Sequence, residues 1–200
     1  TDVNGCMGDS DPVDVTVNEN PTPTITPDGP TEFCDGDSVI LTASSAAAYV
    51  WSTGETTQSI TVTTSGTYNV TVVDTNACTG VSGNITITVF NLPTPTVTPS
   101  GPTTFCEGES VTLTSSAAVS YLWSTGETTQ AITVTDSGTY FVTVTNGNGC
   151  SADSDGVDVT VNPLPTPAIT PSGPTTFCDG GSVDLTVSAG ASYMWNTGAT

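Results

Sequence analysis

Residues 121–144 read YLWSTGETTQAITVTDSGTYFVTV. Apolar residues alternate with Thr and Ser along much of this stretch, and a period of two is typical of β-strands that bury one face. Gly-containing groups interrupt the alternation and predict turns. Thr is both β-branched and polar, so it suits the solvated face of a strand. The stretch therefore predicts short β-strands with Trp123 in their core, and an all-β fold.

The same pattern recurs along the chain at a spacing of 72 residues. This step separates the members of three sets, which are Trp51, Trp123 and Trp195; Cys34, Cys106 and Cys178; and Cys6, Cys78 and Cys150. A fixed period of this length indicates a repeat architecture. We expect complete units at 21–92 and 93–164, the C-terminal part of a preceding unit at 1–20, and the N-terminal half of a further unit at 165–200. Because half a unit exposes its core and its strand edges, we expect further repeats of the same polypeptide on both sides.

Within the unit 21–92 the alternation predicts six strands. They are expected at 22–26, 39–44, 49–52, 59–63, 67–73 and 84–90. Pro clusters where units meet, as in Asn-Leu-Pro-Thr-Pro at 91–95. Such connectors are short and stiff, which predicts consecutive domains held in line.

The charged residues of the chain make several classes of function improbable. The 200 residues include 20 Asp and Glu and no Lys, Arg or His, which gives a formal net charge of −20. This charge disfavours binding to nucleic acid and docking to anionic membranes. His and Lys bases and Arg clamps are absent, so we expect no enzyme. No apolar run reaches the roughly 20 residues that a membrane helix needs, so we expect no direct membrane insertion.

Three motifs in the unit 93–164 resemble the immunoglobulin superfamily. They are Gly-Glu-Ser-Val-Thr-Leu-Thr at 108–114, the central Trp123, and Asp-Ser-Gly-Thr-Tyr at 136–140. The last motif resembles a tyrosine corner, in which the Tyr hydroxyl bonds the backbone upstream. The resemblance implies tandem immunoglobulin-like β-sandwich domains of about 72 residues, arranged head to tail. It also implies that Trp51, Trp123, Tyr68 and Tyr140 are structural core residues.

A second resemblance concerns the positions of the cysteines. Phe-Cys-Glu-Gly-Glu-Ser-Val at 105–111, Tyr-Leu-Trp-Ser-Thr-Gly-Glu-Thr-Thr at 121–129 and Asn-Gly-Cys at 148–150 are similar to immunoglobulin-like repeats of large surface adhesins from Bacteroidetes-type bacteria, gliding-motility adhesins among them. The resemblance implies a secreted, cell-surface protein. Its expected function is a structural and adhesive stalk or extracellular filament. An array of carbohydrate-binding or other ligand-binding modules is the alternative, and self-assembly through neighbouring chains is a further expectation.

The disulfide pattern departs from that of antibody domains. Ala43 and Val70 stand where the inter-sheet cysteines would lie, and the cysteines are in loops instead. In an immunoglobulin-like sandwich the loop of Cys34 lies at the opposite end from that of Cys78, and a strand of about seven residues spans roughly 23 Å. Head-to-tail stacking then favours a bond from Cys34 to Cys150 across a junction. The alternative is Cys34 with Cys78 and Cys106 with Cys150.

Two further kinds of site are hypotheses. Acidic loops offer oxygen ligands for calcium, and the candidates are Asp35, Asp37, Asp153 and Asp155. None of these loops matches a defined calcium motif, so solvated turns are the alternative, and no other cofactor is expected. Asp37-Ser38-Val39 resembles an O-glycosylation signal of Bacteroidetes-type bacteria, which makes Ser38 a candidate acceptor.

Overall fold

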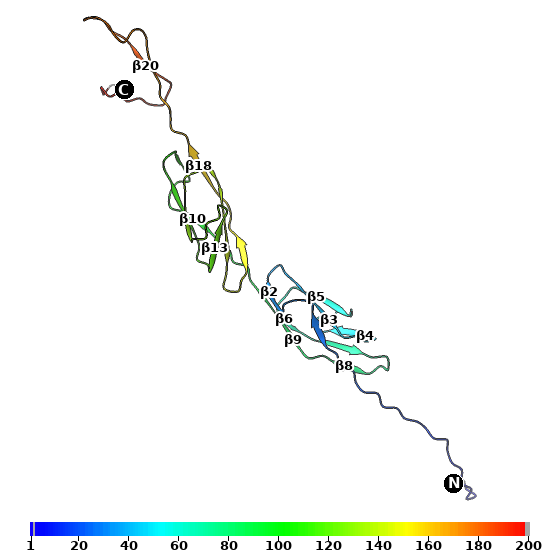
Figure 1. Ribbon diagram of the computed structural model, residues 1–200. Coiled ribbons are helices and arrows are strands. Elements are labelled where there is room, and N and C mark those ends of the chain that lie inside the picture. Colours follow the sequence, from blue (N-terminus) through cyan, green and yellow to red (C-terminus); the bar gives the residue numbers. More distant parts are fainter. Residues whose placement is uncertain (2, 199–200) are drawn as a thin grey trace.

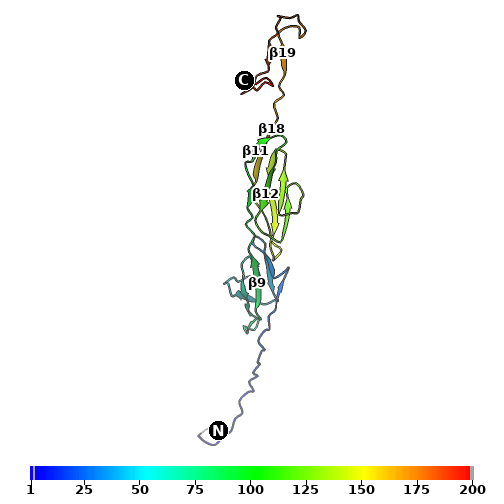
Figure 2. The same ribbon diagram turned by 90° about the vertical axis from the view of Figure 1, so that its left-hand side faces the viewer.

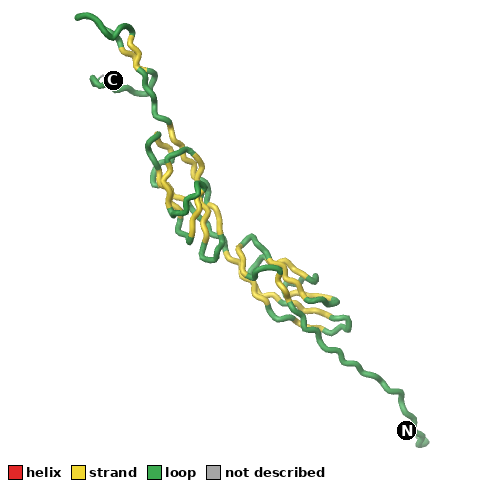
Figure 3. Tube along the Cα trace, viewed as in Figure 1, coloured by secondary structure: helices red, strands yellow, loops and turns green. Residues whose placement is uncertain are grey.

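The regular structure of the chain is entirely β. The computed structural model describes residues 1 and 3–198, and within that part it contains strands and no helix (Figure 3). Two sandwiches follow one another along a common long axis, and both views show them end to end (Figures 1 and 2). The all-β class and the head-to-tail immunoglobulin-like sandwiches predicted from the sequence are confirmed.

The strands follow the repeat. The first sandwich contains β1 (Ile25–Pro27), β2 (Glu32–Cys34), β3 (Val39–Ala43), β4 (Ala48–Trp51), β5 (Ser59–Val62), β6 (Gly66–Tyr68), β7 (Val70–Val73), β8 (Thr79–Val81) and β9 (Ile85–Phe90). The second contains β10 (Val97–Pro99), β11 (Thr104–Cys106), β12 (Val111–Ser115), β13 (Ser120–Trp123), β14 (Ala131–Val134), β15 (Gly138–Tyr140), β16 (Val142–Thr145), β17 (Ser151–Asp153) and β18 (Val157–Asn162). A last pair, β19 (Ile169–Pro171) and β20 (Leu185–Val187), follows.

Each sandwich has two layers of equivalent topology. In the first, β1-β3-β5 form one layer, and β2-β9-β6 together with β4-β7-β8 form the other. The second sandwich repeats this order with β10-β12-β14, β11-β18-β15 and β13-β16-β17. All of these pairs are antiparallel except two, because β2 runs parallel to β9 and β11 runs parallel to β18. The parallel pairs place Cys34 and Cys106 at the end of each sandwich where β9 or β18 finishes.

The core is built from the alternating apolar positions. Trp51 and Trp123 are each 2% exposed, and each indole Nε1 donates a hydrogen bond to a backbone carbonyl six residues onward, Thr57 or Thr129, at 2.9 Å. Burial of a Trp side chain removes about 150–250 Å² from water, so these two residues are major contributors to their cores. The buried residues around Trp51 are Val39, Leu41, Ala43, Ile60, Val62, Tyr68, Val70, Val72 and Ile87. Those around Trp123 are Val111, Leu113, Ile132, Val134, Tyr140, Val142, Val144 and Val159.

Both predicted tyrosine corners form. The hydroxyl of Tyr68 donates to the backbone carbonyl of Thr64 at 2.8 Å, and that of Tyr140 donates to the carbonyl of Asp136 at 2.9 Å. Burial, followed by the charges of Asp136 and Glu127, raises the pKa of Tyr140 above its usual value of 10. Each hydrogen bond ties the tyrosine at the end of β6 or β15 to the turn just before that strand. It thereby holds the ring in the core.

The last hairpin of each sandwich contains a β-bulge that the sequence pattern did not reveal. In the second sandwich, Thr143 pairs with Asp153 and Tyr140 pairs with Val157. Two residues lie between these pairs on the first strand and three on the returning strand, so the returning strand has one extra residue. The buried Ser154 lies in this gap, where its hydroxyl accepts a hydrogen bond from the Val142 amide at 3.1 Å and donates to the Asp155 carbonyl at 2.9 Å. Ser82 makes the same contacts in the first sandwich.

The observed strands differ from the sequence-based expectation in three ways. The expected strand 22–26 is observed as β1, which begins three residues later and ends one residue later. The expected strand 67–73 is divided into β6 and β7 at Asn69, because the bulge breaks its pairing there. Strands β2 and β8 were not expected, since segments of three residues are too short to show an alternation.

The segments outside the two sandwiches contain little regular structure. Among the described residues before β1 no strand forms, and residues 165–198 form only the pair β19 and β20. Leu185 is 47% exposed there, whereas the equivalent Leu113 is fully buried in the second sandwich. Apolar side chains of the core pattern are therefore uncovered in both segments.

Replacement of Ser154 by Ala is expected to destabilise the second sandwich by about 1–3 kcal/mol, because the Val142 amide is left buried without an acceptor. Ser151→Ala is the matched control, since Ser151 is exposed and its hydroxyl bonds only to Thr145 on the surface. The control should change the free energy of unfolding by less than about 0.5 kcal/mol. Urea denaturation followed by tryptophan fluorescence compares the two, and equal stabilities would contradict the role of the Ser154 hydroxyl.

The raised pKa of Tyr140 makes a second prediction, for alkaline pH. A group whose pKa is raised in the folded state contributes stability below its unfolded pKa of about 10, and this contribution is lost as the pH rises through the folded value. Tyr140→Phe should therefore remove one late step from the ultraviolet titration of tyrosinate and reduce the alkaline loss of stability. The two titration curves are subtracted to isolate the step that belongs to Tyr140. If that step lies at or below pH 10, the pKa of Tyr140 is not raised.

Candidate functional site: the joint between two sandwiches

The first half of the site lies at the end of the first sandwich where its connector begins. Cys34 is the last residue of β2 and pairs with Phe90, the last residue of β9. Because these two strands are parallel, they finish at the same end of the sandwich. The backbone amide of Asp35 then donates to the Phe90 carbonyl at 2.8 Å, which fixes the turn after Cys34. Parallel pairing thus places Cys34 next to the chain that leads into the second sandwich.

The second half is the turn between β16 and β17 at the facing end of the second sandwich. The Asn146 side-chain Oδ1 accepts hydrogen bonds from the backbone amides of Asn148 at 3.0 Å and Cys150 at 3.1 Å. Asn is favoured in such turns because its short side chain replaces a backbone acceptor. Gly149 has a φ of +82°, which a side chain would disfavour. The turn presents Cys150 to the first sandwich.

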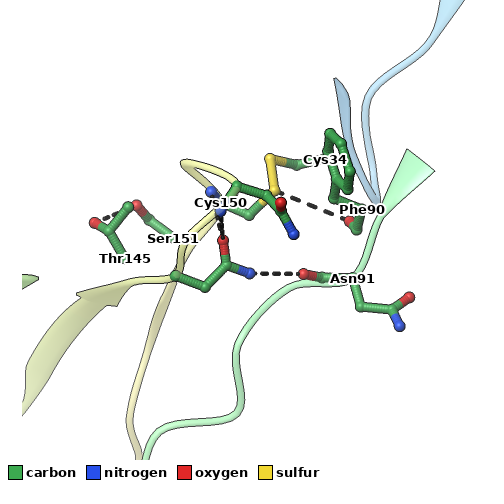
Figure 4. Close-up of a disulfide and its surroundings, with 8 residues drawn as sticks. Cys34, Phe90, Asn91, Thr145, Cys150 and Ser151 are labelled. Atoms are coloured by element: carbon green, nitrogen blue, oxygen red, sulfur yellow. Dashed lines mark hydrogen bonds between the residues drawn. A yellow bond between two sulfur atoms is a disulfide. The ribbon is translucent and has the colours of Figure 1, made fainter. Parts of the chain in front are cut away.

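A disulfide between Cys34 and Cys150 joins the two halves. The Cα atoms are 5.6 Å apart, within the usual range for a bridged pair, and the S–S distance is 1.98 Å. Figure 4 shows the bond together with a second tie, in which the Asn146 Nδ2 donates to the carbonyl of Asn91 at 3.0 Å. The Cys150 Sγ also lies 4.0 Å from the Phe90 carbonyl oxygen. We call these five residues, Cys34, Phe90, Asn91, Asn146 and Cys150, the joint.

The joint buries one of its two cysteines and leaves Cys34 partly exposed. Cys150 is 1% exposed, although its turn lies at the end of the sandwich. The structure joins Cys34 to Cys150 and contains neither bond of the alternative pairing, since Cys78 and Cys106 carry no disulfide in the described chain. The role of the Asn146 amide was not anticipated from the sequence. Its signal was the Asn-Gly-Asn-Gly-Cys run at 146–150, which is rich in turn residues.

The first sandwich has an equivalent turn, between β7 and β8, and its cysteine, Cys78, carries no disulfide. Asp74 replaces Asn146, and its Oδ1 accepts from the backbone amides of Asn76 and Cys78, both at 2.8 Å. The Cys78 Sγ lies 4.0 Å from the carbonyl oxygen of Asn18. This contact reproduces the one between Cys150 and Phe90, one repeat earlier in the chain. A carboxylate has no proton to donate, so Asp74 cannot make the bond that Asn146 makes to the connector.

The calcium candidates are not brought together. Asp153 accepts a hydrogen bond from the Thr143 hydroxyl at 2.6 Å, while Asp35, Asp37 and Asp155 are exposed. In the part of the chain that the structure describes, no three Asp, Glu, Cys or His residues are grouped so that they could hold a metal ion. Ser38 is exposed in the turn between β2 and β3. It is therefore accessible, and its modification stays a prediction.

The sequence and the fold were compared with known proteins. Residues 93–163 match the model of a family described as Ig-like domain, CHU_C associated, which is a Bacteroidetes-type immunoglobulin-like domain. No curated protein matches at a significant level. The family is in general non-enzymatic. An Ig-like domain with a disulfide indicates a location outside the cytoplasm.

Several solved structures are similar in fold at low sequence identity. Murine CEACAM1b is 16% identical over 70% of this chain and 100% of its own, with a TM-score of 0.33. A chain in the crystal structure of the mouse coronavirus receptor-binding domain complexed with its murine receptor is 14% identical over 70% of this chain and 100% of its own, with a TM-score of 0.36. The three N-terminal domains of the bacteriophage RB49 highly immunogenic outer capsid protein are 20% identical over 88% and 72%, with a TM-score of 0.36.

No helix that could cross a membrane occurs in the residues described.

Replacement of Asn146 by Asp is expected to loosen the joint while it preserves the turn. The variant keeps the Oδ1 acceptor for the two backbone amides but loses the donor to Asn91. One hydrogen bond contributes about 1 kcal/mol net, so the joint should open about fivefold more often and the disulfide should be reduced about fivefold faster by dithiothreitol. Thiol trapping and mass spectrometry measure this rate.

Asp74→Asn is the matched control, because it makes the reverse change in the equivalent turn, away from the disulfide. It should leave the reduction rate of the Cys34–Cys150 bond unchanged. Equal rates for Asn146→Asp and the unmodified chain would show that the Asn91 contact does not hold the joint closed.

Proposed function

We propose that this chain is a segment of a structural and adhesive stalk, or extracellular filament, of a repetitive bacterial cell-surface protein. The observation that carries the proposal is the disulfide between Cys34 and Cys150, which links the end of one sandwich to the start of the next. A disulfide within a domain stabilises that domain. A disulfide between domains instead limits how they move relative to each other.

Two covalent links between the sandwiches restrict bending at the joint more than a single link would. The peptide connector, with Pro93 and Pro95, is the first link, and the disulfide is the second. A Pro-rich connector is already semi-rigid. The hydrogen bond from Asn146 to the Asn91 carbonyl is a third, non-covalent contact across the same joint. Such a joint suits a protein that must keep its reach under shear.

The surface chemistry is consistent with an extended stalk. All 20 ionisable acidic side chains carry the same sign, and the chain has no Lys, Arg or His to neutralise them. Mutual repulsion favours solubility and disfavours lateral collapse. The same composition provides no His or Lys for acid–base catalysis. The proposal therefore assigns the chain to reach, stiffness and spacing, at a secreted, cell-surface location that the disulfide favours.

A ligand-binding module array is the second candidate, and one observation favours it. Phe141 is 38% exposed and Leu122 is 52% exposed on the outward face of the second sandwich, where β13 and β16 pair. Exposed aromatic rings are typical of sugar-binding surfaces. Trp51 and Trp123 are unavailable for this purpose because they are buried. If this candidate is correct, Phe141→Ala should abolish binding to a glycan array.

Small-angle X-ray scattering of the monomer fraction of the full chain, and of each variant, tests the stalk proposal. The unmodified oxidised chain should give the distance distribution of a narrow rod. The double variant Cys34→Ser with Cys150→Ser removes the disulfide without leaving a reactive thiol, so the joint should bend and the radius of gyration should decrease. The matched control, Cys78→Ser with Cys106→Ser, removes two cysteines that carry no disulfide and should scatter like the unmodified chain. Identical scattering from all three would contradict the proposed stiffening role.

A further inference from the structure

Gly147, the residue that follows Asn146, is a glycine that its turn does not require. Its backbone is not in the left-handed region, whereas Gly149 in the same turn has a φ of +82°. A Cβ atom at Gly147 would meet nothing within 4 Å beyond its chain neighbours. The equivalent position in the first sandwich holds Thr75. Neither backbone conformation nor space explains Gly147, which leaves the chemistry of the Asn-Gly pair.

An Asn-Gly pair can modify itself, because glycine has no side chain to obstruct attack by its backbone nitrogen. After base removes its proton, the Gly147 nitrogen attacks the Asn146 Cγ. The new C–N bond closes a succinimide ring, the Cγ–Nδ2 bond breaks, and Nδ2 leaves as ammonia after it takes up a proton. Water then opens the ring to aspartate or isoaspartate. The reaction consumes one water, releases one ammonia and needs no oxidant.

The closed joint restrains the Asn146 amide at both of its polar atoms. Nδ2, the leaving group, donates to the carbonyl of Asn91 at 3.0 Å (Figure 4). Oδ1 accepts from the backbone amides of Asn148 at 3.0 Å and Cys150 at 3.1 Å. Attack on Cγ makes this planar carbon tetrahedral and moves both atoms. It therefore competes with all three hydrogen bonds.

Of these three bonds, only the one to Asn91 depends on the first sandwich. The other two lie within the turn of Asn146 itself. The disulfide between Cys34 and Cys150 keeps the Asn91 carbonyl in place. When this disulfide is reduced and the joint opens, Nδ2 loses its acceptor while the turn keeps its own bonds.

The product of the reaction cannot restore the joint. A carboxylate has no hydrogen to donate to the Asn91 carbonyl. The turn itself accepts a carboxylate at this position, because the equivalent Asp74 Oδ1 accepts from the amides of Asn76 and Cys78, both at 2.8 Å. Isoaspartate would also lengthen the main chain of the turn. Conversion of Asn146 to aspartate thus spares the turn and removes the tie to the connector.

We propose that Asn146-Gly147 is a self-modification site that records opening of the joint. While the disulfide is intact, the amide is held and its deamidation is slow. Once the joint opens, the amide is released and deamidates, and the new carboxylate weakens the joint permanently. A reversible reduction thereby becomes an irreversible loss of stiffness. The proposal deepens the stalk function and rests on the joint described there.

The test compares deamidation at position 146 with the joint closed and open. Monomer of the full chain is incubated at mildly alkaline pH with and without dithiothreitol. Tandem mass spectrometry follows digestion with chymotrypsin, which does not cut at the new carboxylate. Loss of one hydrogen bond should speed the conversion about fivefold in the reduced chain. The double variant Cys34→Ser with Cys150→Ser should convert at this faster rate without any reductant.

The neighbouring Asn148-Gly149 pair is the internal reference. Asn148 is exposed, and its side chain makes none of the hydrogen bonds of the joint. Its conversion should change by less than about twofold on reduction, because the turn keeps its own bonds. Equal rates at position 146 with and without reductant, or no conversion there in the reduced chain, would overturn the proposal.

Gly147→Ala separates the chemistry from a structural effect on the turn. The added methyl obstructs the attacking nitrogen, so the reduced variant should lose most of the conversion at position 146. Because the site is open, the first reduction of the Cys34–Cys150 disulfide should stay within about twofold of the unmodified rate. Undiminished conversion in this variant would contradict the proposed route through Gly147.

A second cycle of reduction measures the consequence for the joint. Cys6, Cys78, Cys106 and Cys178 are replaced by Ser, so that only the joint disulfide can form again after incubation in the reduced state. The second reduction should be about fivefold faster than the first, because the Asn91 bond is gone. With Gly147→Ala added, the two rates should agree. Conversion at position 146 without a faster second reduction would refute the permanent weakening.

Failure here is distinguishable from failure of the stalk function, because scattering is measured before incubation. A rod that needs its disulfide, but converts equally with and without reductant, refutes only the self-modification. Conversion that follows the redox state, in a chain whose scattering ignores the disulfide, refutes only the stiffening role.

Discussion

The parallel pairing of β2 with β9 is the constraint on which the rest of this structure depends. It makes Cys34 and Phe90 the last residues of two neighbouring strands, so the Cys34 sulfur lies beside the chain that leaves the sandwich. If β2 were merely part of a loop, Cys34 would have no fixed position relative to Asn91. β11 pairs with β18 in the same way 72 residues later, so the second sandwich places Cys106 beside the start of its own connector.

The chain is held together without any attraction between charged side chains, since it has no Lys, Arg or His. Apolar burial around Trp51 and Trp123 supplies most of the stabilisation within each sandwich. Neutral hydrogen bonds then specify the details, such as the tyrosine corners and the bulge at Ser154. At the joint, a covalent bond and one amide hydrogen bond link the two sandwiches. Because the chain has no Lys, Arg or His, ion pairs between side chains contribute nothing to association between its copies.

The sequence predicted the features that depend on repetition and alternation. The core Trp and Tyr positions followed from the period of two and from the resemblance of residues 136–140 to a tyrosine corner. Two features required the structure. Strand β2 is three residues long and shows no periodicity, so its parallel pairing could not be read from the chain. Asn146 is an ordinary turn residue in sequence, and its bond to Asn91 depends on how two separate sandwiches meet.

The central claim is that the disulfide crosses from one sandwich to the next. The most direct measurement is a non-reducing peptide map of the native, monomeric chain after alkylation of its remaining thiols. A peptide that joins the segment of Cys34 to the segment of Cys150 is the result that this account predicts. A peptide that joins Cys34 to Cys78, both from the first sandwich, would contradict it.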